Sequence, residues 1–600
     1  MNTPADVPDT LRIGNCSGFF GDRIHAAREM VDGGPIDVLT GDWLAELTMY
    51  ILHKTRERSG GYARTFLREL EEVLPTCIER GITVVSNAGG LQPEGLAGAV
   101  RELARRQGLD VHVASVAGDD ITPHLRELRA QGEKFVNLDT GEVLPADAPV
   151  VTANAYLRAR PIADALAAGA QVVVTGRVTD AALVVGPALH AFGWSDRDLG
   201  AIAGAVVAGH VIECGAQCCG GNYAFFEEVP NREHIGFPVA ELHPDGSSVI
   251  TKHPGTGGMV TVGTVTAQLL YEINGPRYLS PDAVARFDTI RLSQQGADRV
   301  RIAPVRGEAP PDTLKVTANL DAGWRNAMTL ALTGAQVVEK ARFAAAAVWA
   351  GIPGGRDGFA ETAEDLSGDL TGGGMAYLRL AVRDDDGEAV GRAFSGAVVE
   401  TSLSSYPGTF FTSSPSGAQG VARYWPTTVS AAAVTPRIEC DGRPLPATPL
   451  VSFDRAADDG PPATEVSAIA TRLGRDTTGM VVVPLWVLVG ARSGDKGGDA
   501  NVGLWADDGA VAAWLQDDFS VAMLKALLPE VEPYPISRHP LPNLRAVNFV
   551  VHGLLGWGVA SNLRLDTQAK GLGELLRSRP VEVPAALVAS GPAAKRLASS

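Results

Sequence analysis

The sequence lacks long apolar runs and contains little cysteine. We find no stretch of about eighteen consecutive apolar residues, the length that crosses a bilayer as a helix. The first residues, MNTPADVPDT, contain no basic segment followed by an apolar core. We therefore expect a cytoplasmic protein with no membrane partner. Six cysteines in 600 residues are too few for a disulfide scaffold and agree with a reducing compartment.

Positive charge is also scarce. The chain has 52 Lys and Arg against 69 Asp and Glu, a formal net charge of −17, which opposes the approach of a polyanion, so we expect no nucleic-acid partner. An anionic small molecule stays compatible with this charge, because a local pair such as Arg492 and Lys496 can dominate the potential in a cleft. The glycine-rich segments 14–23 and 491–503 match neither GxGxxG nor GxxxxGK[ST], so no nucleotide site is expected.

The remaining composition is that of a compact, loop-rich globular protein. The chain is 45% apolar and 20% charged, with 68 Gly and 38 Pro. Its length exceeds what one hydrophobic core usually spans, which predicts several domains.

The first third of the chain alternates short apolar runs with helical patterns. This order predicts an α/β fold with mostly parallel βαβ units, whose ligand-binding loops lie at the carboxyl ends of the strands. Small and polar residues follow each run, in the segments GNCSGFFGDR, TGDW, SNAGG, AGDD and TGRVTD. The predicted strands are Leu11–Ile13, Ile36–Leu39, Ile82–Ser86, Val111–Val116 and Gln171–Thr175, and the predicted helices include Tyr62–Leu74, Pro93–Gln107 and Pro161–Ala168.

The rest of the chain predicts an α+β extension and a small terminal domain. Strands are expected at Val300–Ile302, Leu314–Ala318 and Met375–Val382, and the Pro- and Asp-rich stretch Pro444–Thr464 is expected to be a linker. After it, apolar runs at Val481–Val489, Asn501–Ala506 and Ala546–Val551 and a helical pattern at Phe519–Leu528 suit a ferredoxin-like α+β sandwich.

The segment ARSGDKGGDANVG, residues 491–503, is the strongest candidate for a binding site. We interpret it as a glycine-rich turn that leaves a strand over 481–490, where bare backbone and a lysine can approach an anion. A solvated hairpin loop is the competing interpretation. The candidate substrate-binding residues here are Arg492, Ser493, Asp495, Lys496 and Asn501.

Three strand exits offer further candidates. In TGRVTDAAL, Arg177 could hold a carboxylate or phosphate and Asp180 could act as a base, or the two could form a helix cap and a structural ion pair. Asp42 could be a desolvated carboxylate or an N-cap. Asn87 could donate to an oxyanion or form a turn.

His210, Glu213 and Cys214 lie close together in the sequence. His210 and Glu213 could transfer protons and Cys214 could be a nucleophile, or all could be ordinary core residues. Zinc is a further interpretation if Cys218 and Cys219 are included, but the spacing lacks paired CxxC motifs, so we predict no metal site.

Two other segments are weaker candidates. Lys252 and His253 precede the GTGG turn at 255–258, which suits the phosphates or carbonyl of an acyl thioester or a plain surface loop. Cys16 and Ser17 could be nucleophiles, but without a nearby base in the sequence we interpret them as turn residues.

Several unusual motifs occur together in one order. They are LRIGNCSGFFGDR, GDWLAELTM, SNAGGLQPEG, VVTGRVTDAALVVGP, GHVIECGAQCCGGNY, GTGGMVTVGTVTAQLLYEI and ARSGDKGGDANVG. With these motifs the chain resembles the acyclic terpene utilisation AtuA family over nearly its whole length. One departure is the Cys218–Cys219 pair, where a smaller residue or threonine is expected at one position.

The resemblance implies a large AtuA domain over about residues 10–460, with a possible break near 200–280, and a ferredoxin-fold AtuA-like domain over 480–585. Residues 1–9 and 586–600 are expected to be flexible ends. The resemblance also implies degradation of branched terpenoid acids, whose intermediates are carried as coenzyme A thioesters. A composition rich in Ala, Gly, Arg and Asp is typical of a bacterial genome of high GC content. The family takes its name from a pathway and not from a proven reaction.

Together these features predict a hydratase, dehydratase or lyase that acts on an acyl-CoA or branched unsaturated carboxylate. Asp180, His210 or Glu213 would move the proton, Asn87 would hold the enolate oxygen, and Arg177, Arg492 and Lys496 would bind the anionic end. No cofactor is required beyond coenzyme A as part of the substrate, and we expect a homo-oligomer. The alternative is a non-catalytic ligand-binding or scaffold protein of the same pathway.

Overall fold

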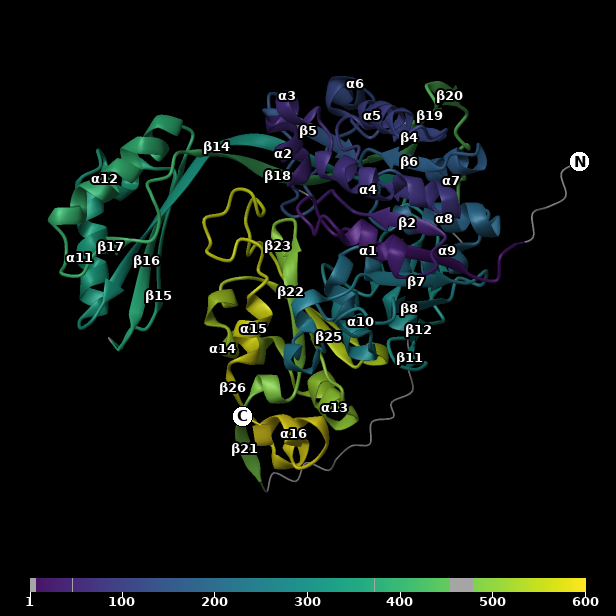
Figure 1. The fold of residues 1–600 in the computed structure, drawn as a ribbon. Coiled ribbons are helices and arrows are strands. Elements are labelled where there is room, and N and C mark those ends of the chain that lie inside the picture. Colours follow the sequence, from purple (N-terminus) through teal and green to yellow (C-terminus); the bar gives the residue numbers. More distant parts are fainter. Residues whose placement is uncertain (1–6, 46, 372, 454–478, 600) are drawn as a thin grey trace, which may run out of the picture.

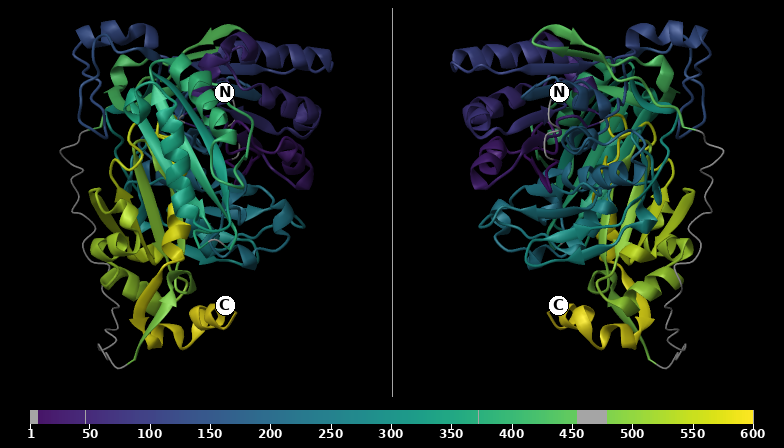
Figure 2. Two further views of the ribbon diagram at one scale, coloured as in Figure 1. Left: turned by 90° about the vertical axis from the view of Figure 1, so that its left-hand side faces the viewer. Right: turned by 90° about the vertical axis from the view of Figure 1, so that its right-hand side faces the viewer.

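The computed structural model describes residues 7–45, 47–371, 373–453 and 479–599. Figure 1 shows a central α/β body, a lobe that projects to its left, and a lower part made from the end of the chain. The body and the lower part lie side by side in all three views (Figures 1 and 2). No helix among the described residues is both long and apolar enough to span a bilayer.

An eleven-stranded sheet forms the body, in the order β11-β12-β8-β7-β1-β2-β3-β6-β4-β19-β20. Its central strands pair in parallel, as the alternating pattern predicts, and its flanks are antiparallel. The parallel strands are β1 (Leu11–Asn15), β2 (Val38–Gly41), β3 (Thr83–Ser86), β6 (Val172–Thr175) and β4 (Val113–Ala117). The flanking strands are β7 (Pro238–Leu242), β8 (Ser248–Lys252), β12 (Val300–Ile302), β11 (Leu292–Gln294), β19 (Arg437–Cys440) and β20 (Arg443–Leu445).

Helices cover both faces of this sheet, and the apolar strand residues alternate between the two cores. Helices α1 (Ala26–Gly33), α4 (Arg64–Arg80) and α5 (Pro93–Arg106) cover one face. Helices α7 (Arg160–Ala167), α8 (Ala182–Phe192) and α9 (Leu199–Ile212) cover the other. All five strands and three helices predicted for the first third are confirmed, with shifts of a few residues at their ends.

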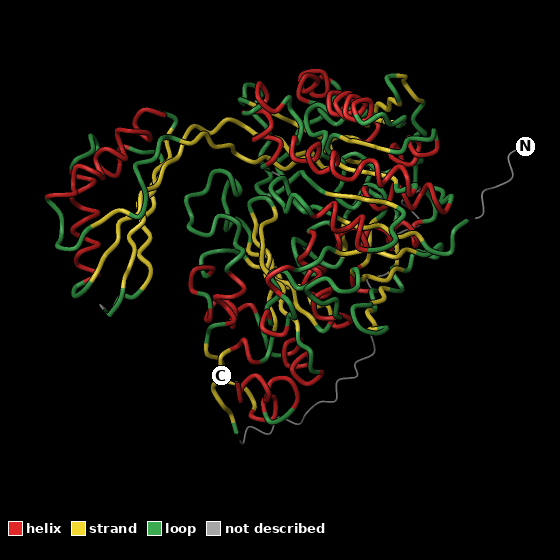
Figure 3. The backbone as a smooth tube through the Cα atoms, viewed as in Figure 1, coloured by secondary structure: helices red, strands yellow, loops and turns green. Residues whose placement is uncertain are grey.

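The projecting lobe is connected to the body by one very long strand. Strand β14 (Thr313–Thr333) pairs with β5 (Val150–Ala155) and β18 (Gln419–Ser430) in the body and with β16 (Met375–Asp384) in the lobe. Its pairing with β18 shifts register between Asp321 and Trp324, around Gly323 at φ +78°, which bends the strand where it leaves the body (Figure 3). The lobe adds β15 (Glu361–Gly368), β17 (Phe410–Phe411), α11 (Val337–Ala350) and α12 (Phe394–Glu400) around its own core.

The terminal part has the expected ferredoxin-like architecture, with a sheet ordered β22-β23-β25-β24 and helices on one face. Its elements are β22 (Gly490–Lys496), β23 (Asp499–Trp505), α13 (Gly509–Asp517), α14 (Val521–Leu527), β24 (Ile536–Leu541), β25 (Ala546–Val551) and α15 (Leu572–Arg577). A second, two-stranded sheet joins β21 (Met480–Pro484) to β26 (Pro580–Pro584). The predicted α/β fold class with a small ferredoxin-like domain is confirmed.

One local prediction in this part of the chain is wrong. Residues 481–490 are not one strand, because β21 ends at Pro484 and a 3₁₀ turn precedes β22. The flexible end expected over residues 586–600 stays a prediction, and helix α16 (Gly591–Ser599) lies within it. Of the predicted linker, residues 454–464 lie outside the described residues.

The interface between the two domains depends on small residues. A Cβ atom at Gly503 of β23 would lie 2.6 Å from the Cβ atom of Leu270 in the large domain. We therefore expect Gly503→Ala to lower the free energy of unfolding by about 1–3 kcal/mol, since the added methyl group overpacks a rigid contact. Gly509→Ala is the matched control, because nothing lies within 4 Å of that Cβ. Equal thermal unfolding of the two variants would contradict this packing.

Helix α4 buries a carboxyl group, Glu69, which is 3% exposed. Burial, with the negative charge of Asp22, raises the pKa of Glu69 to about 8. Since this pKa lies above that of the unfolded chain, the folded state holds the extra proton, and stability is lost as the pH rises toward 8. Glu69→Gln removes this loss. Between pH 4 and pH 9 its free energy of unfolding should therefore rise relative to that of the wild type by roughly 3–5 kcal/mol, as measured by urea denaturation.

The control for Glu69 is Glu79→Gln, at an exposed position of the same helix. Its pH dependence should follow the wild type. If the stability of Glu69→Gln depended on pH as that of the wild type does, Glu69 would not be the group that holds the extra proton in the folded state.

Candidate functional site

Polar side chains from several strand exits meet at the carboxyl edge of the parallel sheet. Asp42 follows β2, Asn87 follows β3, Asp119 follows β4, and Arg177 and Asp180 follow β6. Parallel strands end at the same edge, so residues far apart in the sequence become neighbours there.

Arg177 is the cation at the centre of this edge and is 4% exposed. Its Nη2 atom lies 3.0 Å from Oδ1 of Asp180, and its guanidinium carbon lies 4.2 Å from the ring centroid of Tyr156. It also donates a hydrogen bond to the carbonyl of Leu44. The side chain of Asp180 is 30% exposed, so the site is buried at the arginine and reaches solvent at the aspartate.

Asp42 is a buried carboxyl held by Asn87. The Asn87 Nδ2 group donates to Asp42 Oδ1 at 2.6 Å, and Asn87 Oδ1 accepts from the Trp43 amide at 2.8 Å. Burial raises the pKa of Asp42, the charge of Asp180 raises it further, and Arg177 opposes the increase. Asn87 therefore positions Asp42, and its predicted contact with an enolate oxygen stays a prediction.

Helix α9 carries His210 and Glu213 to this edge. The helix is apolar on all sides and nearly every residue in it is buried, which is typical of a helix enclosed by other elements. Gly209 allows close packing, since a Cβ atom there would lie 2.8 Å from the Cα atom of Ala181. This contact brings His210 next to the turn that carries Asp180.

His210 and Glu213 form a neutral pair. The Nδ1 atom of His210 lies 3.4 Å from Oε1 of Glu213, with 1% and 10% of their side chains exposed. Burial lowers the pKa of His210 to about 4. Burial raises the pKa of Glu213 well above its ordinary value, and Asp180 and Glu272 raise it further. Burial therefore favours the protonated form of the Glu213 carboxyl group, and the imidazole of His210 is uncharged at neutral pH.

This pair also has unused hydrogen-bonding capacity. Both ring nitrogens of His210 and the Oε2 atom of Glu213 are buried without a hydrogen-bond partner among the described residues. Buried polar atoms in native proteins are usually satisfied, so these atoms mark a place where a polar ligand would gain hydrogen bonds.

The terminal domain contributes Lys496 to the same site. Burial raises the pKa of Glu213, and the positive charge of Lys496 opposes this increase. Asn501 fixes the approach, because its amide donates to the carbonyl of Leu270 at 2.6 Å and accepts from the Glu272 amide at 2.9 Å. Asn501 is thus part of the domain interface, and its predicted role in substrate binding stays a prediction. We call Arg177, Asp180, His210, Glu213, Glu272 and Lys496 the Glu213 cluster.

The segment 491–503 forms a buried hairpin, which corrects its interpretation as a turn after a strand. Residues 490–496 belong to β22, and only Gly497 and Gly498 form the turn. Alternation along the strand puts Arg492 and Lys496 on one face and Ser493 and Asp495 on the other.

The two faces of β22 have different neighbours. The guanidinium carbon of Arg492 lies 4.2 Å from the ring centroid of Tyr271 in the large domain, and its side chain hydrogen bonds to Gln217. Ser493 Oγ instead accepts from the amide of Gly573 in α15 at 2.9 Å. Ser493 and Asp495 are therefore turned away from the Glu213 cluster.

Sequence reasoning missed three residues near the site. Glu272 has a positive φ of +55°, an unusual conformation for a residue with a side chain. Its backbone N–H donates a hydrogen bond to Asn501 Oδ1, which holds this conformation. The ring of Tyr278 packs against that of His210 at a tilt of 53°, with ring centroids 4.9 Å apart. Burial raises the pKa of Asp119 to about 7, and its Oδ2 accepts from the Arg177 amide at 2.9 Å. Of these three residues, only Asp119 had a signal in the sequence, because it lies in the polar segment AGDD that follows a predicted strand.

The cysteines near the site are thiols. Burial raises the pKa of Cys214 well above its ordinary value, and the charge of Glu213 raises it further. Cys16 is buried and its pKa is raised in the same way, so neither is an activated thiolate at neutral pH, contrary to the nucleophilic interpretation of Cys214. In the described part of the chain, no group of three or more His, Cys, Asp and Glu side chains has the geometry to hold a metal ion.

Lys252 has partners outside the Glu213 cluster, and its predicted role in substrate binding stays a prediction. Its Nζ atom lies 3.2 Å from Oδ2 of Asp298 and donates to the carbonyl of Thr256 at 2.8 Å. His253 Nε2 lies 2.8 Å from the carbonyl of Met30. Both residues stabilise the turn after β8.

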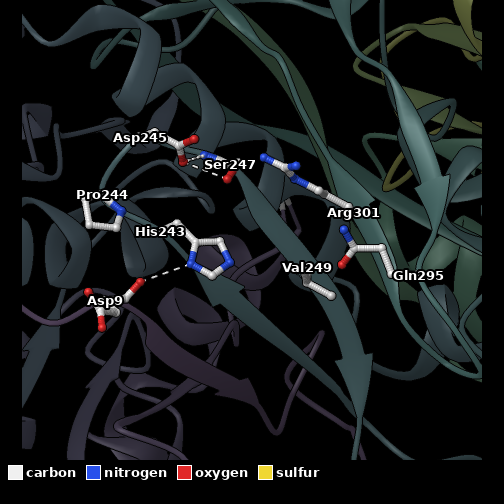
Figure 4. Close-up of a pocket in the computed structure, with 8 residues that line it drawn as sticks. All are labelled: Asp9, His243, Pro244, Asp245, Ser247, Val249, Gln295 and Arg301. Atoms are coloured by element: carbon white, nitrogen blue, oxygen red, sulfur yellow. Dashed lines mark hydrogen bonds between the residues drawn. The ribbon is translucent and has the colours of Figure 1, made fainter.

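A separate surface cavity of about 480 Å³ lies beside the β7–β8 turn (Figure 4). Its polar side chains are paired locally, with His243 Nδ1 3.0 Å from the carbonyl of Asp9 and Asp245 accepting from Ser247 Oγ at 2.7 Å. None of the predicted site residues lines it, and we assign it no role.

Comparisons with known proteins agree with this architecture. Residues 483–582 match the AtuA ferredoxin-like domain. No solved structure matches the chain. A GTP 3',8-cyclase of Peptoclostridium acidaminophilum is 33% identical over 93 residues, which are 15% of this chain and 29% of that protein. The chain thus spans less than a third of that relative, too little to transfer an activity.

The large domain carries the decisive match. Residues 11–440 match the acyclic terpene utilisation family protein AtuA, which covers most of the chain and confirms the resemblance seen in the motifs. The chain therefore belongs to the acyclic terpene utilisation AtuA family.

Proposed function

We propose that the protein adds water to, or removes it from, a branched unsaturated acid or its coenzyme A thioester at the Glu213 cluster. The observation that carries this proposal is the neutral Glu213–His210 pair beside the charged Arg177–Asp180 pair. A protonated carboxyl group and a carboxylate in one site supply the acid and the base that hydration needs.

Each member of the cluster has a distinct task in this scheme. Asp180, the more exposed carboxylate, takes a proton from water as the oxygen attacks the β-carbon of the double bond. Glu213 donates its proton to the α-carbon, so that water adds across the bond. After the product leaves, Asp180 releases its proton to solvent and Glu213 takes one up, which restores both groups. Lys496 and Arg177 attract the anionic end of the substrate, and His210 accepts or donates a hydrogen bond through its unpartnered nitrogens. No redox cofactor enters this scheme.

The proposal is tested with 3-methylcrotonate and 3-methylcrotonyl-CoA as probes. Purified protein is incubated with each in ¹⁸O-labelled water, and products are followed by mass spectrometry. We expect gain of one labelled water with the preferred probe. Absence of both turnover and calorimetric binding would overturn the proposal, and binding without turnover would favour a non-catalytic ligand-binding protein.

A further inference from the structure

The terminal domain contains a second constellation, outside the Glu213 cluster. Asp499 begins β23, Ser537 lies on β24, and His552 follows β25. The Nδ1 atom of His552 lies 2.8 Å from Oδ2 of Asp499, and its Nε2 atom lies 2.8 Å from Oγ of Ser537. We propose that these residues form a Ser-His-Asp catalytic triad that hydrolyses a carboxylic ester or thioester.

The sheet register brings the three side chains together. Ala500 pairs with Val551 in an antiparallel ladder. One residue further along, Asp499 therefore lies opposite His552. Ser537 pairs with Val550, two residues before His552. Because side chains alternate along strands, Val550 and His552 point to the same face, and Ser537 points there with them.

The hydrogen bonds select the tautomer that a triad needs. An ionised Asp499 can only accept, so Nδ1 of His552 carries the proton and Nε2 accepts from the Ser537 hydroxyl. Asp499 is itself held by the amide of Gly553, which donates to its Oδ1 at 2.8 Å. The aspartate side chain is 13% exposed and the histidine 42%, so the orienting group is covered while the base is open to a substrate.

The serine also lies on an accessible strand. β24 is at the edge of its sheet, and the His552 amide donates to the carbonyl of Pro535 at 2.9 Å. Hydrogen-bonded pairs alternate along an antiparallel ladder, so the amide of Arg538, next to Ser537, points away from β25. This amide can donate to the oxygen that develops negative charge when the serine attacks.

The proposed reaction is a two-step acyl transfer to water. Ser537 Oγ attacks the carbonyl carbon while its proton passes to His552 Nε2. The bond to the leaving group then breaks, and His552 gives that proton to the departing alcohol or thiol. Water attacks the acyl-serine with His552 accepting its proton, which is returned to Ser537 as the free acid leaves.

The test uses the full-length protein with an alkyl fluorophosphonate as the serine reagent, p-nitrophenyl acetate as the ester and acetyl-CoA as the thioester. We expect a phosphonyl adduct on Ser537 by peptide mass spectrometry and hydrolysis of at least one substrate. Hydrolysis should fall at least ~100-fold in Ser537→Ala and in His552→Gln. The two substrates show whether the natural leaving group is an alcohol or a thiol.

The matched control is Ser578→Ala, an exposed serine of the same domain whose hydroxyl donates to the Leu575 carbonyl. It should keep the wild-type rate and adduct. Thermal unfolding of Ser537→Ala checks that the variant is folded. An absent adduct, or hydrolysis that does not depend on Ser537, overturns the proposal. The adduct is read on Ser537 itself, so the result is independent of water addition at the Glu213 cluster.

Discussion

Replacing Glu213 by glutamine is expected to lower the turnover of water addition by about 10²–10⁴-fold, the usual contribution of a positioned general acid. Glutamine keeps the shape and neutrality of the protonated carboxyl group but has no proton to give. Burial and the charges of Asp180 and Glu272 favour the protonated form of the wild-type residue. Steady-state kinetics with the preferred 3-methylcrotonyl probe measures the effect.

Stability should change little in this variant near neutral pH, because the wild-type residue is also uncharged there. The control is Glu339→Gln, at a side chain of α11 that is 67% exposed and paired with Arg342. Its turnover should equal that of the wild type. If Glu213→Gln kept full turnover, Glu213 would not be the acid.

Replacing Arg177 by methionine is expected to destabilise the protein by about 3–5 kcal/mol at pH 7. The variant fills a similar volume but leaves the carboxyl groups of Asp180 and Asp42 at a buried edge without their cation. Burial raises the pKa of Asp42 and Arg177 opposes the increase, so losing Arg177 should favour the protonated form. The loss should therefore shrink as the pH falls. Urea denaturation at several pH values measures this.

Two further variants make the Arg177 result specific. Arg177→Met combined with Asp180→Asn should recover part of the lost stability, since it removes one of the unpaired charges. Arg342→Met breaks an ion pair whose side chains are 70% and 67% exposed and should change stability by no more than about 0.5 kcal/mol. If Arg177→Met lowered the free energy of unfolding by less than about 1 kcal/mol, the buried ion pair between Arg177 and Asp180 would not contribute to folding as expected.

The strand-exit residues could be predicted because their position depends on local pattern. Alternation of apolar runs and helices implies parallel strands, and parallel strands share one carboxyl edge. Asp42, Asn87, Arg177 and Asp180 all lie at that edge in the structure. The hydrogen bond from Asn87 to Asp42 could not be predicted, because it depends on the distance between two loops.

The segment 491–503 shows why a local pattern can mislead. Glycine and aspartate are frequent in turns, yet here they occupy paired strands β22 and β23. Gly503 is a glycine within strand β23, and the Cβ atom of Leu270 in the large domain lies 2.6 Å from where a Cβ atom of residue 503 would be. A requirement that comes from a distant segment leaves no signal in the surrounding sequence.

The order of strands and helices, the family and the residues at the carboxyl edge of the parallel sheet follow from the amino-acid pattern, because each can be recognised in short stretches of the sequence. The arrangement of the Glu213 cluster does not. It requires Gly209 against Ala181, Glu272 held at positive φ by Asn501, and Lys496 delivered by another domain. These contacts join residues that are tens to hundreds of positions apart, and the raised pKa of Glu213 arises only once they exclude water from it.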